Sequence, residues 1–305
     1  MMNEPLTTNT LGEFAAAVKK LRRHWELKSH QELWFRGEAR DYKNTILRPE
    51  LYRPAEGAAL KPIPELLDIE NELHEEFKRN AVEYADRVDD EWEWDSYFLM
   101  QHHSGPTRLL DWSDGALIAL HFALRNTKYE LEEREDHQQD ARVYVLEAHR
   151  YSEKLNSTLN AKNAASEWKK YVDDNPNEDL DRDSWEDLYL PNFGSDREEI
   201  DLPLSPLAFD MAHITRRIAA QRGRFIIFGK DPNWLANEFK GPDSLIRVIV
   251  IPHRFRGFIR QELRDCGVTE SVIYPDLDGV GRETRQLWED RRRHAKGPSC
   301  DGDEQ

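Results

Sequence analysis

The spacing of apolar residues predicts a chain that mixes helices with short buried strands. Thr10 precedes a segment with apolar residues at helical spacing, which predicts a capped helix over residues 11–25. The next apolar run, Leu33 to Phe35, is short and bulky and ends at Gly37, as is typical of a strand. Residues 63–99 return to a helical pattern and lead into a polar central segment.

The second half of the chain repeats these signals. An amphipathic helix is predicted over residues 114–127. Further strands are predicted around residues 143–146, 223–229 and 245–252, and further helices over 254–267 and 278–296. Together these elements predict an α+β fold with a mixed or antiparallel core sheet, flanking helices and an N-terminal helical layer.

One long stretch breaks the pattern. From Tyr151 to Asp201 the sequence is polar, acidic and irregular, which predicts an insertion rather than part of the core. The predicted organisation is an N-terminal helical segment over 1–30 and one domain over 31–285 with this insertion. Residues 286–305 would form the basic end of a helix and a disordered tail.

Charge narrows the classes of partner. The 305 residues carry a formal net charge of -16, and 33% of them are charged. Such a field repels phosphate backbones and anionic lipids, so we expect no broad nucleic-acid surface and no membrane partner. A small anionic ligand held in a local arginine pocket remains compatible with this charge.

The chain shows no sign of export or of a metal framework. The first residues lack a signal-peptide pattern, and no run of about 18 apolar residues occurs, so a cytoplasmic location is expected. Cys266 and Cys300 do not have the spacing of a metal site. No metal is predicted.

The first candidate for chemistry is Arg36 with Gly37. An arginine at the end of an apolar strand places five donors at the strand edge, and the missing side chain of glycine would let a ligand approach the backbone. This arrangement suits a phosphate or a carboxylate. The alternative is an ion pair between Arg36 and an acid such as Glu38.

The segment from Gln101 to Ser113 is the densest polar motif. Its candidate residues are Gln101, His102, His103, Thr107, Arg108, Asp111, Trp112 and Ser113. A short strand that leads directly into a helix N-terminus presents free amides, so an anion could bind there beside Arg36 or Arg108. The structural alternatives are a buried salt bridge between Asp111 and Arg108, and helix capping by Ser113 or Asp114.

The adjacent histidines are not expected to bind one metal ion, because neighbouring side chains diverge on both strands and helices. We expect His102 to face the cleft as a hydrogen-bonding or acid/base group, and His103 to be packed or exposed.

A third polar cluster precedes the strand over 223–229. It contains Arg216, Arg217, Gln221 and Arg222. These residues predict a second cationic edge, and the alternative is a helix C-terminus whose arginines complement the helix dipole.

Four segments together resemble the FRG domain. They are FRG at Phe35–Gly37, QHHSGPTRLLDWS at Gln101–Ser113 with its ALHFA continuation, RIAAQRGRFII at Arg217–Ile227, and VTESVIYPDLDGV at Val268–Val280. The resemblance spans roughly Gln31 to Glu283. It implies the family but does not by itself imply a reaction.

The chain also resembles, more weakly, the ADP-ribosyltransferases of the Arg-Ser-Glu type. This resemblance implies that Arg36 holds the pyrophosphate or nicotinamide ribose of NAD and that Asp111 to Ser113 lie near the second motif. Gln221 stands at the place of the catalytic Glu, and a neutral amide cannot stabilise an oxocarbenium ion by its charge. Either Asp111 or another acid takes that role, or the nucleotide is bound without transfer.

Three functions therefore fit the sequence. The first is NAD-dependent ADP-ribosyl transfer to a macromolecular target, with Arg36, His102, Asp111 and Gln221 as catalytic residues. The second is a non-catalytic module that binds a nucleotide-like small molecule. The third is a metal-dependent nuclease that uses His102 or His103 with Asp111, although the motifs supply few carboxylates for it. In the first two, the residues expected to contact the ligand are Gly37, Gln101, His103, Thr107, Arg108, Trp112, Ser113 and Arg217.

Overall fold

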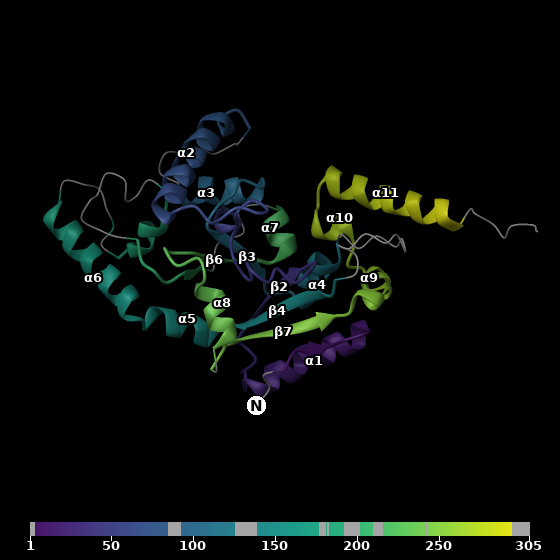
Figure 1. The fold of residues 1–305 in the computed structure, drawn as a ribbon. Helices are drawn as coiled ribbons and strands as arrows, with labels where there is room; N and C mark the ends of the chain where they lie inside the picture. The colour runs from purple at the N-terminus through teal and green to yellow at the C-terminus, as the bar shows by residue number, and fades with distance from the viewer. Residues whose placement is uncertain are drawn as a thin grey trace, which may run out of the picture.

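A single mixed sheet forms the centre of the protein (Figure 1). The computed structural model describes residues 4–84, 93–125, 139–176, 181, 183–191, 202–209, 216–241 and 243–294. Seven strands within this part of the chain pair in the order β1-β7-β4-β2-β3-β6-β5. Only β1 and β7 run parallel, so the sheet is mixed but largely antiparallel, as predicted.

The elements follow the apolar pattern closely. The strands are β1 Leu6–Thr7, β2 Leu33–Glu38, β3 Leu109–Ser113, β4 Ala141–Glu147, β5 Leu207–Phe209, β6 Gly223–Ile227 and β7 Ile246–Ile251. The α-helices are α1 Leu11–His24, α2 Ile63–Ala81, α3 Glu93–His102, α4 Ala116–Leu124, α5 Ala148–Asn156, α6 Leu159–Asp174, α7 Arg216–Gln221, α8 Trp234–Lys240, α9 Arg256–Asp265, α10 Glu270–Ile273 and α11 Leu277–His294. Short 3-10 turns are η1 Glu50–Tyr52, η3 Trp185–Tyr189 and η4 His253–Phe255.

The alternation of side chains along β2 divides the core between two faces of the sheet. Leu33 and Phe35 pack with α1, α4 and α9 on one face. Trp34 packs on the other face with residues of α2, α5 and α8. On the first face, α3 and α7 form a separate cluster over β3 and β6. The first face is therefore covered by two groups of helices, and the boundary between these groups follows β2 and β3.

The pairing between β2 and β3 is unusually short. It consists of one register pair, Phe35 with Ser113, whereas β2 pairs with β4 along its whole length. β3 in turn pairs with β6 from Leu109 to Ser113. The two central strands therefore diverge, and the backbone groups of β3 that precede Ser113 need other partners on the side that faces β2.

Most predicted elements are confirmed, including the α+β class and the helix capped by Thr10, whose side chain accepts from the Glu13 amide. The short strands β1 and β5 were not predicted from the sequence. The stretch from Tyr151, for which no helix was predicted, contains most of α5 and all of α6, and its reading as an insertion stays a prediction. Trp168 and Tyr189 within this stretch are fully buried.

Several expectations fall outside the described residues, among them the tail from residue 295, the acidic positions 85–92 and the end of the expected insertion at 192–201. The domain boundaries stay a prediction. Among the helices that the structure describes, none combines the length and the apolar character needed to cross a membrane.

A buried histidine between α2 and α3 should make stability depend on pH. The His74 ring lies 2.8 Å from the Ser96 hydroxyl, and burial lowers the His74 pKa from 6.5 to about 4, helped by Lys78. Between these values the unfolded chain takes up a proton that the folded chain does not, so the free energy of unfolding falls as the pH is lowered. We expect His74→Gln to remove up to about 3 kcal/mol of this fall.

Urea unfolding of both proteins at pH 7 and pH 4.5 measures this effect. The wild type should lose more stability than His74→Gln over this interval. Equal losses in the two proteins would show that His74 does not titrate below its ordinary range.

Candidate functional site

A cavity of about 370 Å³ opens where β2 and β3 diverge. Its wall combines arginines, aromatic rings and uncharged polar groups from segments far apart in the sequence. The lining residues used below are Arg36, Gly37, Glu38, Tyr42, Arg53, Phe98, Gln101, His102, Asp111, Trp112, Ser113, Phe122, Arg125, Arg217, Gln221, Phe225 and Tyr274. Most of the residues predicted from the sequence therefore meet in one cavity.

Arg36 connects the two diverging strands. Its Nη1 donates to the backbone carbonyl of Asp111 at 2.7 Å, and its Nε donates to Glu38 at 3.2 Å. The Asp111 carbonyl lies beyond the single β2–β3 register pair, so the guanidinium supplies the hydrogen bond that a strand would otherwise give it. The ion pair with Glu38, which was the structural alternative, is present.

Asp111 is held by a relay of side chains from the same motif. Gln101 Nε2 donates to Asp111 Oδ2 at 3.0 Å, and the Thr107 hydroxyl donates to Gln101 Oε1. The Asp111 side chain is exposed to the cavity, and the protein that surrounds the cavity displaces part of the bulk water around the carboxylate. This loss of bulk water raises its pKa, while Arg36 and the Gln101 hydrogen bond act in the opposite direction. Thr107 itself is fully buried, so it positions Gln101 and does not line the cavity.

His102 lines the cavity, and His103 is exposed and lies outside the lining. Burial lowers the pKa of His102 to about 4, and Arg217 and His103 contribute further. The His102 imidazole is therefore neutral at pH 7 and offers one donor and one acceptor to a ligand.

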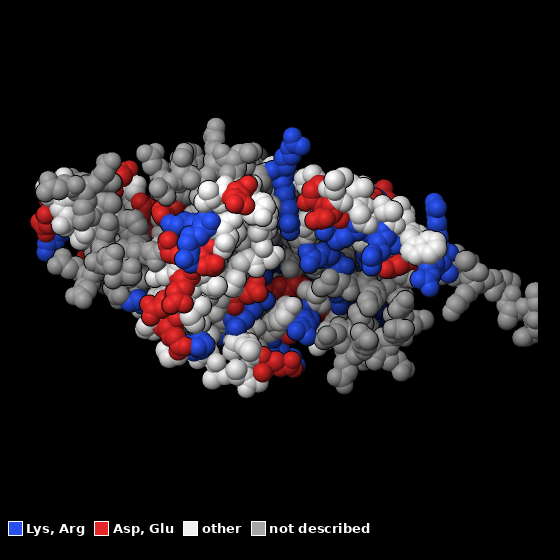
Figure 2. All heavy atoms as spheres, turned by 90° about the horizontal axis from the view of Figure 1, so that it is seen from above, with Lys and Arg blue, Asp and Glu red and all other residues white. Residues whose placement is uncertain are grey.

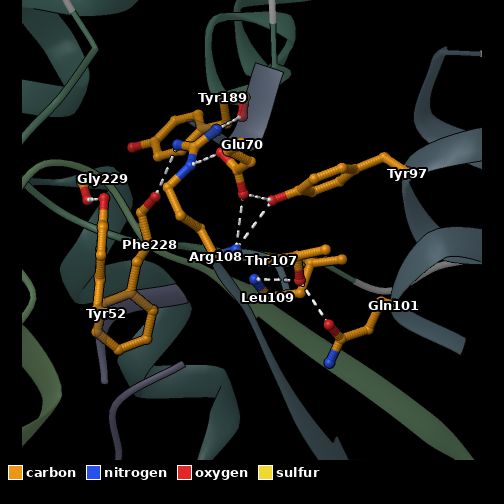
Figure 3. Close-up of polar contacts among 10 residues, drawn as sticks. All are labelled: Tyr52, Glu70, Tyr97, Gln101, Thr107, Arg108, Leu109, Tyr189, Phe228 and Gly229. Carbon is orange, nitrogen blue, oxygen red and sulfur yellow. Dashed lines mark hydrogen bonds and ion pairs between the residues drawn. The ribbon is translucent and has the colours of Figure 1, made fainter. Parts of the chain in front are cut away.

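Arg108 does not reach the cavity. It is buried in a network with Glu70 and Tyr97, in which its Nε pairs with Glu70 and its backbone amide donates to Glu70 Oε1 at 2.8 Å (Figure 3). Its remaining donors bond to the carbonyls of Phe228 and Tyr189. The prediction that Arg108 contacts the ligand was therefore wrong, and so was the alternative of a salt bridge to Asp111, because a glutamate 38 positions earlier in the chain binds the guanidinium instead.

Gly37 is needed for a reason other than ligand approach. A Cβ at this position would lie 1.8 Å from the carbonyl oxygen of Ala119 and 2.6 Å from the amide of Ala123, both in α4. The absence of a side chain lets α4 pack directly on β2. Gly37 thus lines the cavity while it fixes the distance between helix and strand.

The start of α4 differs from the prediction. Its N-cap is Gly115, and neither Ser113 nor Asp114 occupies that place. The Ser113 hydroxyl accepts from the Gly115 amide and donates to the Gln221 carbonyl, so it links β3 to the end of α7. Asp114 pairs with Arg224 at 2.7 Å and also with Arg222. These contacts tie the two motifs together.

The third cluster also differs from its structural alternative. Arg216 and Arg217 begin α7 rather than end it, so they do not complement the C-terminal dipole of that helix. Arg217 instead extends into the cavity and lies over the Tyr274 ring, 4.5 Å from its centroid. The Gln221 side-chain amide donates to the Ile273 carbonyl at 3.4 Å.

Comparison with models of known protein families matches residues 31–132 to the FRG domain. This segment is an FRG domain. The match contains the first two of the four motifs, and the third and fourth follow it in the chain. No curated protein and no solved structure matches the chain.

The cavity is shared between the FRG domain and the chain that follows it. Arg36, Asp111 and Arg125 come from within the match, whereas Arg217 and Tyr274 come from the later motifs. Figure 2 shows the molecule from above, and on this side Lys and Arg side chains lie around a hollow near the middle. The matched segment alone would therefore lack part of the wall.

Several lining residues were not predicted from the sequence, among them Arg53, Arg125 and Tyr274. Tyr274 lies in the IYPD segment of the fourth motif, which was the available signal. Arg53 and Arg125 directly follow the apolar residues of η1 and α4. At such a position an arginine side chain ordinarily extends its charged group into solvent. Among the described residues, no group of three or more His, Cys, Asp and Glu side chains is arranged to hold a metal ion, so the nuclease alternative has no ligand set there.

Proposed function

We propose that this cavity binds a nucleotide-like anionic ligand. The observation that carries the proposal is the convergence of Arg36, Arg53, Arg125 and Arg217 on one cavity. Burial and repulsion by the charge of Arg36 lower the pKa of Arg53, and Glu38 opposes this shift only in part. A bound anion offsets that repulsion, and the planar fork of arginine matches phosphate oxygens.

The rest of the wall suits a nucleoside. Phe122 supplies apolar ring surface, on which a base can stack. Gln101 and the neutral His102 supply hydrogen-bonding groups for hydroxyls. The volume lies within the range of small-molecule sites, roughly 300–1,000 Å³.

A panel of ligands tests this function through the melting temperature of the whole chain. We expect ADP, ADP-ribose and NAD to stabilise the folded protein, by about 2.7 kcal/mol at a concentration one hundred times the Kd. Adenosine is the control, since it has the base and the sugar without phosphate, and it should stabilise much less. A panel in which none of the phosphorylated compounds shifts the transition contradicts the proposal.

ADP-ribosyl transfer from NAD is the second candidate. It is supported by one observation, that the Asp111 carboxylate is open to the cavity beside Gln101 and Arg36. In such a transfer the bond from ribose C1′ to nicotinamide breaks, nicotinamide leaves, and the acceptor bonds to C1′ and loses its proton. Asp111 could stabilise the positive charge that develops on the ribose. Measuring free nicotinamide in the same NAD samples separates transfer from binding alone.

A further inference from the structure

The four arginines of the cavity fall into two pairs with different partners. Arg36 and Arg53 approach from the side of β2 and η1, and both contact the buried carboxylate of Glu38, at 3.2 and 3.8 Å. Arg36 also holds the Asp111 carbonyl, and Arg53 donates to the Arg48 carbonyl and lies over the Tyr42 ring. This pair is already neutralised in part by Glu38, and three of its nitrogens, Arg36 Nε, Arg36 Nη1 and Arg53 Nε, donate within the protein.

Arg125 and Arg217 form the second pair, at the end of α4 and the start of α7. Both contact Tyr274: Arg125 donates to its hydroxyl, and Arg217 lies over its ring. Within the described part of the chain, no carboxylate lies within 4.0 Å of either guanidinium. The ring offers each a weak attraction, which is much smaller than that of an ion pair in the same surroundings.

A third arginine that contacts the Tyr274 ring has a carboxylate partner. Arg282 of α11 lies 4.4 Å from the Tyr274 centroid, and its Nε contacts the buried Glu270 at 3.1 Å. Arg282 is not part of the cavity wall. Tyr274 is therefore in contact with three guanidinium groups, and the described residues place no carboxylate within 4.0 Å of the two that face the cavity.

From this asymmetry we infer that the phosphate of the ligand binds to Arg125 and Arg217 beside Tyr274, and that Arg36 is a positioning residue that joins β2 to β3. This inference rests on the proposed function. A phosphate at Arg36 would compete with Glu38 and with the Asp111 carbonyl, whereas at Arg125 and Arg217 it would displace no ion pair with a described residue. It would also relieve the repulsion between the two cations.

The position of Asp111 sets the orientation of the rest of the ligand. A carboxylate repels a phosphate but accepts hydrogen bonds from hydroxyl groups, and Gln101 fixes the Asp111 side chain from the other side. We therefore place the phosphate end at Tyr274 and an uncharged, hydroxyl-bearing part of the ligand toward Asp111. The ligand class that follows is a sugar phosphate or nucleotide with its charge at one end.

Binding of ADP and of inorganic pyrophosphate to variants of the whole chain tests the inference by calorimetric titration. Arg217→Gln and Arg125→Gln should each weaken binding of both probes roughly 10- to 100-fold, the effect of losing a charge-assisted hydrogen bond. Arg282→Gln is the matched control, since it removes a cation from the same ring outside the cavity. We expect it to bind within about threefold of wild type. Melting temperatures confirm that each variant folds. If Arg217→Gln does not fold, the binding of the two probes to Arg125→Gln tests the inference.

The outcomes separate the inference from the function it rests on. If the wild type binds either probe and both cavity variants bind equally well, the inference is overturned while the proposed function stands. An equal loss in Arg282→Gln and Arg217→Gln also overturns it, because the effect would then belong to the ring and not to the cavity. If the wild type binds neither ADP nor pyrophosphate, the proposed function fails together with the inference.

Discussion

Replacing Glu70 with alanine is expected to lower the free energy of unfolding by about 3–5 kcal/mol, because it leaves the buried Arg108 guanidinium without its counter-charge. Glu70 and Arg108 are 0% and 1% exposed. The carboxylate accepts from the Arg108 side chain and amide and from the Tyr97 hydroxyl, so one substitution removes three hydrogen bonds, and only the Arg108 amide keeps a second acceptor, the Tyr97 hydroxyl (Figure 3). Urea unfolding of the variant and the wild type measures the loss.

Two variants on the same helix separate the possible causes. Glu72→Ala removes an exposed glutamate of α2 and should change the stability by less than about 0.5 kcal/mol. Glu70→Gln keeps the shape and one acceptor but removes the charge, so its loss should fall between those of the two alanine variants. A loss in Glu70→Ala no larger than that in Glu72→Ala would mean that the buried network does not stabilise the fold.

The same network shows why part of the molecule could be predicted from the sequence and part could not. Leu33 to Phe35 and the capping residue Thr10 announce their elements locally, because strand alternation and helix capping depend on neighbours in the chain. The partner of Arg108 is set by the packing of α2 on β3, which no local pattern records. The nearest acid in the sequence, Asp111, was therefore the wrong partner.

The candidate site follows the same rule. The motif residues Arg36, Gln101 and Asp111 could be expected to gather, since they lie at the ends of predicted elements. Arg125 could not, because its role comes from its contact with Tyr274, almost 150 positions later. The short strands β1 and β5 were missed for a related reason: two or three residues are too few to show alternation, and they become strands by pairing with β7 and β6.

Replacing Gly37 with alanine is expected to cost about 3 kcal/mol or more and to abolish ligand binding. The added methyl would meet backbone atoms of α4, at 1.8 Å from the Ala119 carbonyl oxygen, and a backbone cannot rotate away as a side chain can. Either β2 or α4 must move. Both carry residues of the cavity, Arg36 next to the substitution and Arg125 just after α4, so the two ends of the site would lose their spacing.

Gly281→Ala provides the contrast. This glycine lies within α11, and a Cβ added there would have no atom within 4 Å. The substitution should raise the free energy of unfolding by about 0.5–1 kcal/mol, since alanine loses less entropy than glycine when a helix forms. Denaturant unfolding and ADP titration of both variants compare the two effects. If Gly37→Ala folds and binds as the wild type does, then the contact between β2 and α4 yields at little cost, and the cavity does not depend on it. If it folds but does not bind, the spacing between strand and helix is itself a requirement of the site.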